Sequence, residues 1–457
     1  MLPPTPLHVD YTLPFAVGLL LAVSATLVLL ALTAAQGVLR LLRRKWRPRR
    51  GIRLAALAVL VLGVGASFAT TRIKGATMEH AAVDLAMIQA PRPPAAWRAS
   101  VVPPAPYLLL AGDLHCHINP PDWSDHVARH LPETLQLAKD EGLDFISLVP
   151  HVFSDLYRDR DTPLRIAGAL ADLQARIDAR PADGLILDVG VEYIDPTGHV
   201  GMVFGDVRAA LLATPYDVAV ARPSAFIEAF ADKGGILVVN HPLLTPIHSW
   251  APMASLDISW QPFTGRPPFR QEIAAVDARA ETFEAANLFV SAVRDRFLLG
   301  DSEDSTRRVL GRLDHEILAR RRRMTPVGGT DSHSFYLRPM TFVLATARSR
   351  EAIRDAIQAG RTCVAQPGAC TLEVRPEGTE AFSPVGSSLQ ATTRVEARAS
   401  GHSVVIYRDG ERVATPTSGQ VVSIAVVPGQ CSVLRATVDG GYSAPVYVNC
   451  PFATKGP

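Results

Sequence analysis

Two histidines separated by one residue, His115 and His117, lie in the stretch GDLHCHINP, directly after an apolar run. Side chains alternate along a β-strand, so residues at positions i and i+2 point to the same face. Two imidazoles on one face at a strand end can bind one metal ion, although two solvent-facing histidines at the start of a loop would give the same pattern. Cys116 would point to the opposite face, and we interpret it as a small buried residue rather than a ligand.

Metal-type side chains recur at the ends of other apolar runs between residues 107 and 368. They are His151 after ISLVP, Glu192 in GVEY, His241 in VVNHP, and Asp331 and His333 in GGTDSH. A lone histidine after a strand is usually an ordinary loop residue. In βα barrels, however, the carboxyl ends of the strands meet at one face and form the active site. The recurrence of these residues at strand ends therefore favours a shared metal site.

The elements that would carry these residues alternate in type. Short apolar strands, such as the one expected over 236–241, alternate with amphipathic helices, such as the one expected over 162–178. This alternation is typical of parallel βα units. From 369 to 457 the pattern changes to short β-rich runs separated by turn signals, which predicts a small antiparallel β-sandwich. We interpret it as a packing or structural module, with a carbohydrate- or peptide-binding module as the alternative.

The first 72 residues predict a transmembrane hairpin. Residues 13–39 carry no charge and exceed the roughly 20 residues that span a bilayer as a helix, and 54–71 form a second, shorter apolar run. The loop between them, 40–53, is rich in arginine, and the positive-inside rule places such a loop in the cytoplasm. The rest of the chain would then lie on the periplasmic side of a bacterial inner membrane, with lipid around the two helices. A cleaved internal signal, a buried core segment and a nucleic-acid-binding loop are the alternatives.

The remaining composition sets further limits. A Pro-rich linker is expected over 73–106. The net charge of +2 does not indicate a nucleic-acid-binding protein, and we expect no nucleic acid as a partner. In an oxidising compartment cysteine pairing becomes possible, because Cys363 and Cys370 are close in sequence and Cys431 and Cys450 both fall in the β-rich segment. The connectivity stays open.

Taken in order, GDLHCH, SLVPH, GVEYIDPTGHVG, VVNHP and GGTDSH resemble the motifs of the PHP (polymerase and histidinol phosphatase) family of metal-dependent phosphoesterases, over roughly residues 108–368. The Gly-His pair after Glu192 and the β-rich C-terminal segment are similar to those of an envelope-associated branch of the family, which is related to carbaryl-type ester hydrolases. The resemblance implies an α/β fold, a distorted (β/α)7 barrel whose strand ends hold two or three divalent metal ions. The expected organisation is therefore a hairpin (1–72), a linker (73–106), a metallohydrolase domain (107–368) and a β-sandwich (369–457).

The resemblance also implies a ligand set for each metal. The first metal would be held by His115, His117, Glu192 and Asp331. The third metal would share Glu192 and add His199 and His241. The second metal would be held by His151, His333 and a residue after the HxH pair, for which family spacing favours Asp122 over the alternatives Asp125 and His126.

Other positions near the motifs have more modest interpretations. Glu284 and Asn287 match residues that recur beside the metal site in the family. The family usually has Thr-Asp-His where this chain has Val-Pro-His151, which removes a carboxylate able to orient the histidine. Arg338 is either a surface arginine or a clamp for an anionic substrate. We interpret the arginines at 320–323 as a solvated helix end.

These residue types suit a particular chemistry. Mixed imidazole and carboxylate ligands suit Zn, Mn or Fe. A pair of cations bridged by Glu192 would activate hydroxide as the nucleophile, while Asp331 or His333 would pass a proton to the leaving group. The expectation is a membrane-anchored metal-dependent hydrolase of a small phosphoester. A carbamate or non-phosphate ester substrate and a non-catalytic envelope binding protein are the alternatives, and the oligomeric state is not indicated.

Overall fold

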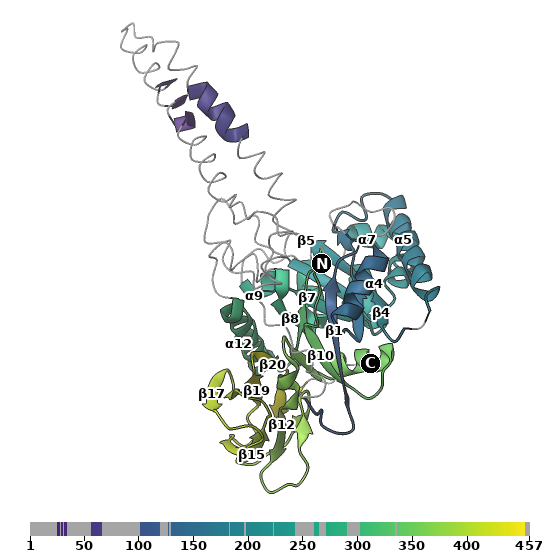
Figure 1. Ribbon diagram of the computed structural model, residues 1–457. Coiled ribbons are helices and arrows are strands. Elements are labelled where there is room, and N and C mark those ends of the chain that lie inside the picture. The colour runs from purple at the N-terminus through teal and green to yellow at the C-terminus, as the bar shows by residue number, and fades with distance from the viewer. Residues whose placement is uncertain are drawn as a thin grey trace. The chain divides into compact units, whose positions relative to one another are not determined.

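The protein is described from a computed structural model (Figure 1). The structure describes residues 25–27, 29–30, 32–33, 56–65, 101–118, 127, 129–181, 183–195, 198–222, 224–242, 260–264, 271–289, 302–333 and 336–452. The chain divides into two compact units, Met1–Ile88 and Gln89–Pro457.

In the first unit the described residues are helical, and they lie at 25–33 and at 56–65, inside the two apolar runs. No helix among the described residues is both long enough and apolar enough to cross a membrane. Most of both predicted spans, the basic loop and the linker up to residue 100 lie outside the described residues. The hairpin therefore stays a prediction.

The first strands of the second unit lie in two sheets, which chain connections and one isolated bridge link into a ring. They are β1 (Leu108–Cys116), β2 (Phe145–Leu148), β3 (His151–Phe153), β4 (Ile186–Val189), β5 (Val191–Asp195), β6 (Gly198–Val203), β7 (Ile236–Asn240), β8 (Thr282–Asn287) and β9 (Thr325–Gly329). One sheet contains β1, β2 and β4, and a second runs β3-β5-β6-β7-β8-β9. The chain passes from β2 to β3 and from β4 to β5 within a few residues, which joins the two sheets. An isolated parallel bridge between Cys116 and Ser332 then brings the segment after β9 back to the end of β1.

The pairing is mixed, which corrects the expectation of wholly parallel strands. Parallel pairs join β1 to β2, β3 to β5, and β8 to β7 and β9, but β6 is antiparallel to both β5 and β7. Asp195 pairs with Gly198, so β5 and β6 form a hairpin too short for a crossover helix. In this register Glu192 is opposite Gly201. His199, two residues from Gly201, therefore shares a face of the sheet with Glu192.

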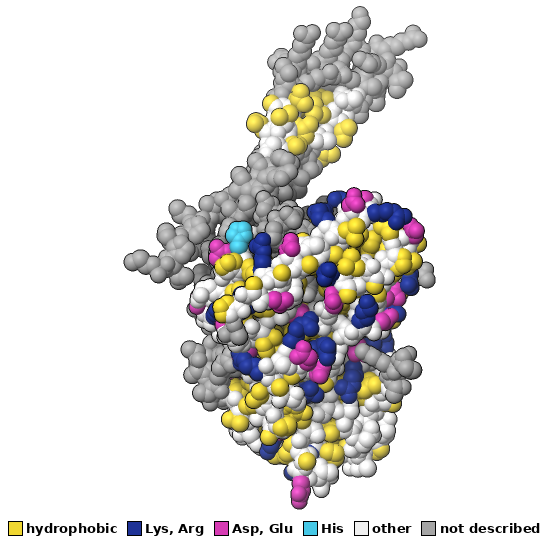
Figure 2. Space-filling model, turned by 90° about the vertical axis from the view of Figure 1, so that its right-hand side faces the viewer, with side chains coloured by type: hydrophobic (Ala, Val, Ile, Leu, Met, Phe, Trp, Pro, Cys, Tyr) yellow, Lys and Arg dark blue, Asp and Glu magenta, His cyan; other side chains and the backbone are white. Residues whose placement is uncertain are grey.

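Helices pack around the ring through their apolar faces. They are α4 (Leu131–Asp140), α5 (Asp161–Asp178), α6 (Val207–Ala213), α7 (Tyr216–Ala221), α8 (Ala225–Asp232), α9 (Gln261–Thr264), α10 (Gln271–Arg279), α12 (Ser302–Arg320) and α13 (Arg350–Gln358). In α5 the buried residues Ile166, Leu170 and Leu173 recur at helical spacing on one face. Figure 2 shows basic and acidic side chains interspersed over the face it presents.

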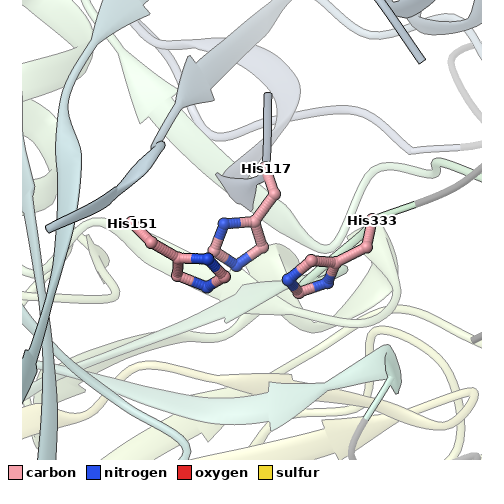
Figure 3. Close-up of side chains that lie close together, drawn as sticks. All are labelled: His117, His151 and His333. Atoms are coloured by element: carbon pink, nitrogen blue, oxygen red, sulfur yellow. The ribbon is translucent and has the colours of Figure 1, made fainter. Parts of the chain in front are cut away.

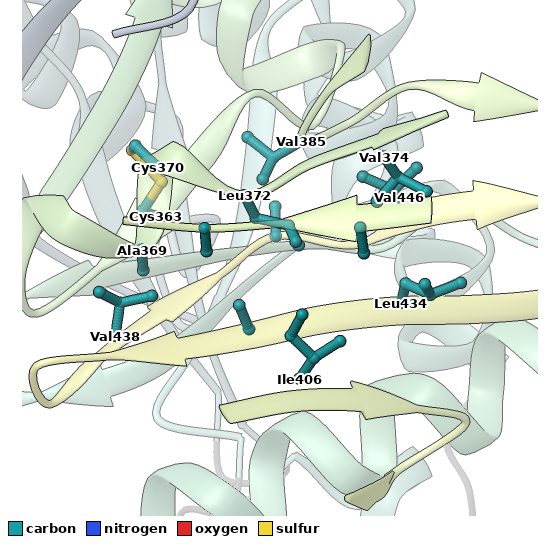
Figure 4. Close-up of a cluster of buried hydrophobic side chains, with 14 of the residues drawn as sticks. Cys363, Ala369, Cys370, Leu372, Val374, Val385, Ile406, Leu434, Val438 and Val446 are labelled. Carbon is teal, nitrogen blue, oxygen red and sulfur yellow. A yellow bond between two sulfur atoms is a disulfide. The ribbon is translucent and has the colours of Figure 1, made fainter. Parts of the chain in front are cut away.

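The C-terminal strands form two sheets around a shared apolar core (Figure 4). After β10 (Thr341–Ala345), β11 (Thr362–Val364) and the 3-10 helix η3 (Pro367–Thr371), the strands are β12 (Glu373–Pro376), β13 (Ser383–Pro384), β14 (Ser388–Leu389), β15 (Arg394–Arg398), β16 (Val404–Arg408), β17 (Glu411–Ala414), β18 (Val422–Ala425), β19 (Ser432–Val438), β20 (Gly441–Ser443) and β21 (Val446–Val448). One sheet runs β13-β12-β15-β18. The other is continuous with the ring, because β20 pairs with β11 and β11 with β10. Backbone pairing thus crosses the domain boundary predicted at 368/369.

Two disulfides and the contacts of Arg323 stabilise this region. Disulfides join Cys363 to Cys370 and Cys431 to Cys450. Arg323 lies over the rings of Tyr447 and Phe452 and donates a hydrogen bond to Ser388 Oγ (2.7 Å). Arg323, which follows the end of α12 at Arg320, therefore contacts the C-terminal strands and is not part of a solvated helix end.

Candidate metal centre

Eight of the nine predicted ligands lie in the described part of the chain, and all of them come together at the ends of the ring strands. They fall into three groups, within each of which the ligand atoms lie within 4.8 Å of one another: His115, His117 and Asp331; Glu192, His199 and His241; and His117, His151 and His333. The ninth, Asp122, and its alternatives Asp125 and His126 lie outside the described residues. That part of the prediction stays open.

The first group is centred on the HxH pair. Nε2 of His115 lies 3.1 Å from Nε2 of His117, and Nε2 of His117 lies 3.0 Å from Oδ1 of Asp331. Nε2 of His115 is also 3.3 Å from Oε1 of Glu192. An imidazole nitrogen can carry one proton, which cannot satisfy several acceptors at once. A cation shared by these atoms satisfies all of them, so the donor set fits a metal ion.

The second group is built on the β5–β6 hairpin. Oε1 of Glu192 lies 3.2 Å from Nδ1 of His199 and 3.5 Å from Nε2 of His241. Its other oxygen, Oε2, lies 3.2 Å from Nε2 of His151 and 3.5 Å from Nε2 of His117. The two oxygens of Glu192 thus face different sets of imidazoles, so this carboxylate could be shared by two metal ions if they were bound there.

The third group consists of three imidazoles that face one another (Figure 3). The ring centroid of His117 is 4.1 Å from that of His151 and 3.9 Å from that of His333. Nδ1 of His333 is 3.0 Å from the carbonyl oxygen of Asp331. Because a carbonyl only accepts, Nδ1 carries the proton and Nε2 of His333 keeps its lone pair. His117 belongs to two groups, whereas the resemblance assigned it to one.

Buried polar residues hold the ligands in place. Oε1 of Glu284 lies 3.0 Å from Nδ1 of His115, and Asn287 donates hydrogen bonds to Glu284 Oε2 (2.9 Å) and Asp331 Oδ2 (3.1 Å). Asn240 donates to Oε1 of Glu192 (2.8 Å). Such partners fix the orientation and tautomer of metal ligands. Glu284 and Asn287 were singled out in the sequence, whereas Asn240 was missed although it directly precedes the His-Pro pair.

The backbone at the site is strained. His241 and Asp331 have φ angles of 28° and 51°, in the left-handed region that residues with side chains rarely adopt. Such strain persists only where the surrounding structure imposes it, and it is typical of functional sites. A Cβ on Gly329 would meet Glu284 Oε1 and His115 Cβ at 2.4 Å each. Only glycine therefore allows β9 to approach the HxH strand this closely.

Burial and charge set the protonation states of the groups. Burial opposes the charged form of His115, but the carboxylates of Asp331, Glu192 and Glu284 outweigh it and raise its pKa well above the usual value. Burial lowers the pKa of His117 well below its usual value, and the neighbouring His333 and His151 lower it further. Burial raises the pKa of Asp113, which lies in the same strand, to about 7. His117 is thus a neutral imidazole ready to bind a cation.

Arg129 is a buried arginine beside the site. Nothing in the sequence had indicated a role for it there. Its guanidinium donates to Ser332 Oγ (2.7 Å), to the Ser332 carbonyl (3.1 Å) and to the Tyr336 carbonyl (3.2 Å). It also lies 2.9 Å from Cys116 Sγ, so it ties the HxH strand to the segment that carries Asp331 and His333. Cys116 is buried, as predicted, and burial raises the pKa of its thiol to about 11. Arg338 is only 7% exposed, so its interpretation as a surface arginine is wrong.

Comparisons with known proteins add two solved structures. A two-domain protein containing a predicted PHP-like metal-dependent phosphoesterase, from Bacteroides vulgatus ATCC 8482, aligns with 77% of this chain and 96% of its own, at 17% identity and a TM-score of 0.37. PsfC from Pseudomonas syringae PB-5123 aligns with 56% of this chain and 90% of its own, at 15% identity and a TM-score of 0.32. Neither similarity is strong enough to carry an argument about family or reaction. No family model and no curated protein matches the chain. What stands on geometry is an α/β protein whose buried histidines and carboxylates form groups able to hold metal ions.

Proposed function

We propose that this chain is a metal-dependent hydrolase that cleaves a phosphoester. The observation that carries the proposal is the position of Glu192, whose two oxygens face two different groups of imidazoles. Divalent cations held there would lower the pKa of a bound water toward neutrality and stabilise the entering and leaving oxygens of a phosphoryl transfer. The mixture of imidazole and carboxylate suits Zn, Mn or Fe, two or three per chain.

The side chains have distinct tasks in this proposal. Glu284, which accepts the Nδ1 proton of His115, leaves Nε2 of that ring free to bind a cation. Asp331 holds its position in the first group through Asn287. His333, with its proton on Nδ1, presents Nε2 for ligation or for proton transfer at the leaving group. Glu192, Asp331 and His333 are thus the residues that we propose for the chemistry itself.

The wider assignment is part of the same proposal. The order of the motifs supports membership of the PHP family, in its envelope-associated branch, and the ring of strand pairings supports a distorted (β/α)7 barrel. The apolar runs and the basic loop support an anchor in a bacterial inner membrane. The disulfides Cys363–Cys370 and Cys431–Cys450 support a periplasmic site, because such bonds persist in oxidising compartments.

The test is elemental analysis of the full-length protein, together with turnover of a phosphomonoester, a phosphodiester and a carboxylate ester. We expect bound Zn, Mn or Fe and turnover of a phosphoester, both lost in Glu192→Gln. The matched control is Glu377→Gln, at a carboxylate that is 47% exposed, which should keep metal and turnover. Metal with turnover of the carboxylate ester alone would overturn the phosphoester assignment. Absence of metal after gentle purification would overturn the proposed hydrolase activity and favour a non-catalytic binding protein.

A further inference from the structure

The imidazoles of the metal centre differ in their access to solvent. The side chains of His151, His199 and His333 are 13%, 12% and 11% exposed. Those of His115 and His117 are 2% and 1% exposed. A substrate that arrives from solvent therefore meets the centre on the side of His151, His199 and His333.

The row of side chains next to these ligands is apolar. His151 and Phe153 are two residues apart in β3, and Phe153 is paired with Ile194 of β5. Ile194 is in turn opposite His199 of β6. Residues two apart in a strand, and residues paired across two strands, share one face of a sheet. Phe153 and Ile194 thus lie on the face that bears the ligands, one row further toward the carboxyl ends of β3 and β5.

Phe153 leaves much of its ring open to solvent. It is 50% exposed, and its ring centroid lies 6.1 Å from that of His151. Single exposed apolar residues are common on protein surfaces. This one, however, adjoins a metal ligand on the side where the centre is accessible. An apolar group that covered the ring would gain free energy from the hydrophobic effect.

A second phenylalanine lies near another accessible histidine of the third group. The ring centroids of His151 and His333 are 5.2 Å apart, and that of Phe289 is 5.8 Å from that of His333. Phe289 follows the end of β8 by two residues, and its backbone N–H donates to the carbonyl of Thr330 (3.1 Å). Each of the two accessible imidazoles of this group therefore has a phenylalanine ring close to it. Phenylalanine rings favour contact with other aromatic rings, in offset or edge-to-face arrangements.

We propose that the substrate of this centre is a phosphoester whose organic group is aromatic. The phosphate lies at the imidazoles and carboxylates, and the aromatic group packs against Phe153, with Ile194 and Phe289 beside it. This inference rests on the proposed function, since it needs a phosphate bound at the metal centre. Phe153 determines specificity in this assignment, because it binds the organic group and takes no part in the chemistry.

Titration calorimetry of the metal-loaded, full-length protein with phenylphosphonate and methylphosphonate tests the inference, because the P–C bond of both compounds resists hydrolysis. We expect phenylphosphonate to bind about tenfold more tightly than methylphosphonate. In Phe153→Ser the two affinities should lie within about threefold of each other. Phe153→Trp, which keeps an aromatic ring, should retain the preference. Elemental analysis should show the metal content of the unaltered protein in both variants, since Phe153 is not a ligand.

Leu212→Ser is the matched control. Leu212 is also 50% exposed, but it lies in α6, which follows the end of β6 remote from His199. This variant should keep the full preference for phenylphosphonate.

The calorimetry separates failure of this inference from failure of the proposed function. Equal affinities for the two phosphonates in the unaltered protein, or a preference that survives in Phe153→Ser, would overturn the inference and leave the phosphoesterase in place. Phe153 would then face another part of this chain rather than substrate. Binding of neither phosphonate would overturn the proposed phosphoesterase itself, and the inference with it.

Discussion

Oε1 of Glu284 lies 3.0 Å from Nδ1 of His115, while Nε2 of the same ring lies 3.3 Å from Oε1 of Glu192. The carboxylate of Glu284 therefore fixes both the tautomer and the rotation of a ring whose opposite nitrogen faces the proposed metal. Its second oxygen accepts the backbone N–H of His241 (2.8 Å), which has a strained φ angle. Glu284 thus supports ligands of two groups without belonging to either.

Glu284→Gln should weaken metal binding about 10- to 100-fold, as the loss of such an orienting partner does at other metal sites. The amide keeps the size of the side chain but removes its negative charge, so His115 loses a partner that favours the correct tautomer. Competition with a chromophoric chelator measures the affinity. An affinity equal to that of the unaltered protein would show that Glu284 does not orient His115.

His117→Ala should remove more metal than His199→Ala. His117 supplies a nitrogen to two of the three groups, whereas His199 supplies one to a single group. Elemental analysis of both variants measures the difference, and His402→Ala, at an exposed histidine between β15 and β16, is the control that should lose none. Full metal content and full turnover in His117→Ala would contradict the assignment of the HxH pair.

The affinity for metal should rise with pH. Carboxylates raise the pKa of His115 well above its usual value, so the metal-free ring carries a proton that a cation must displace. Below the raised pKa the proton competes with the metal, and the dissociation constant should fall about tenfold per pH unit for each displaced proton. Titration calorimetry at several pH values, in buffers that differ in ionisation enthalpy, counts the released protons. A dissociation constant independent of pH would show that His115 is not displaced in this way.

Most of the proposed ligands could be singled out from the sequence because they stand at the end of a short apolar run, whereas His199, which follows YIDPTG, came from the family resemblance alone. β7 is buried along its whole length and β1 from Leu110 onward, so their carboxyl ends are visible as a change from apolar to polar residues. The β5–β6 hairpin was missed because its glycines and its partly buried histidine hide the alternation of a strand. β8, whose sequence TFEAAN mixes polar and apolar residues, was also not recognised as a strand, and β10 was missed although its sequence TFVLA is an apolar run.

The supporting residues could not be read from sequence because their partners are remote. Arg129 and Ser332 are 203 residues apart, and Asn240 and Glu192 are 48 residues apart. A buried polar residue has no periodicity of its own, and its role depends on what the folded chain brings to it. Asn240 carried one usable signal, since a carboxamide at the end of the apolar run ILVVN needs a partner.

Arg129→Met should lower the free energy of unfolding by about 3 kcal/mol or more, because it removes several buried hydrogen bonds that the guanidinium donates at once. Arg129→Lys should not restore the loss, since one ammonium nitrogen cannot replace both Nη1, which donates to Ser332 Oγ, and Nε, which donates to Thr134 Oγ1. Urea unfolding measures the change. The control Arg158→Met, at a side chain that is 58% exposed, should stay within about 0.5 kcal/mol. Equal stability of the Arg129 and Arg158 variants would show that the buried guanidinium does not hold the two segments together.

The two disulfides should differ in their contribution to stability. The bond between Cys431 and Cys450 closes a separation of 19 residues, and that between Cys363 and Cys370 one of 7. Chain entropy predicts a loss of about 3 kcal/mol for the double substitution of Cys431 and Cys450 by alanine, and of about 2 kcal/mol for the other pair. Unfolding under oxidising conditions measures both, and metal content should stay unchanged in the first variant because neither cysteine contacts a ligand. A larger loss from the shorter loop would mean that packing of Cys363 and Cys370 in the shared core, rather than loop entropy, determines their contribution.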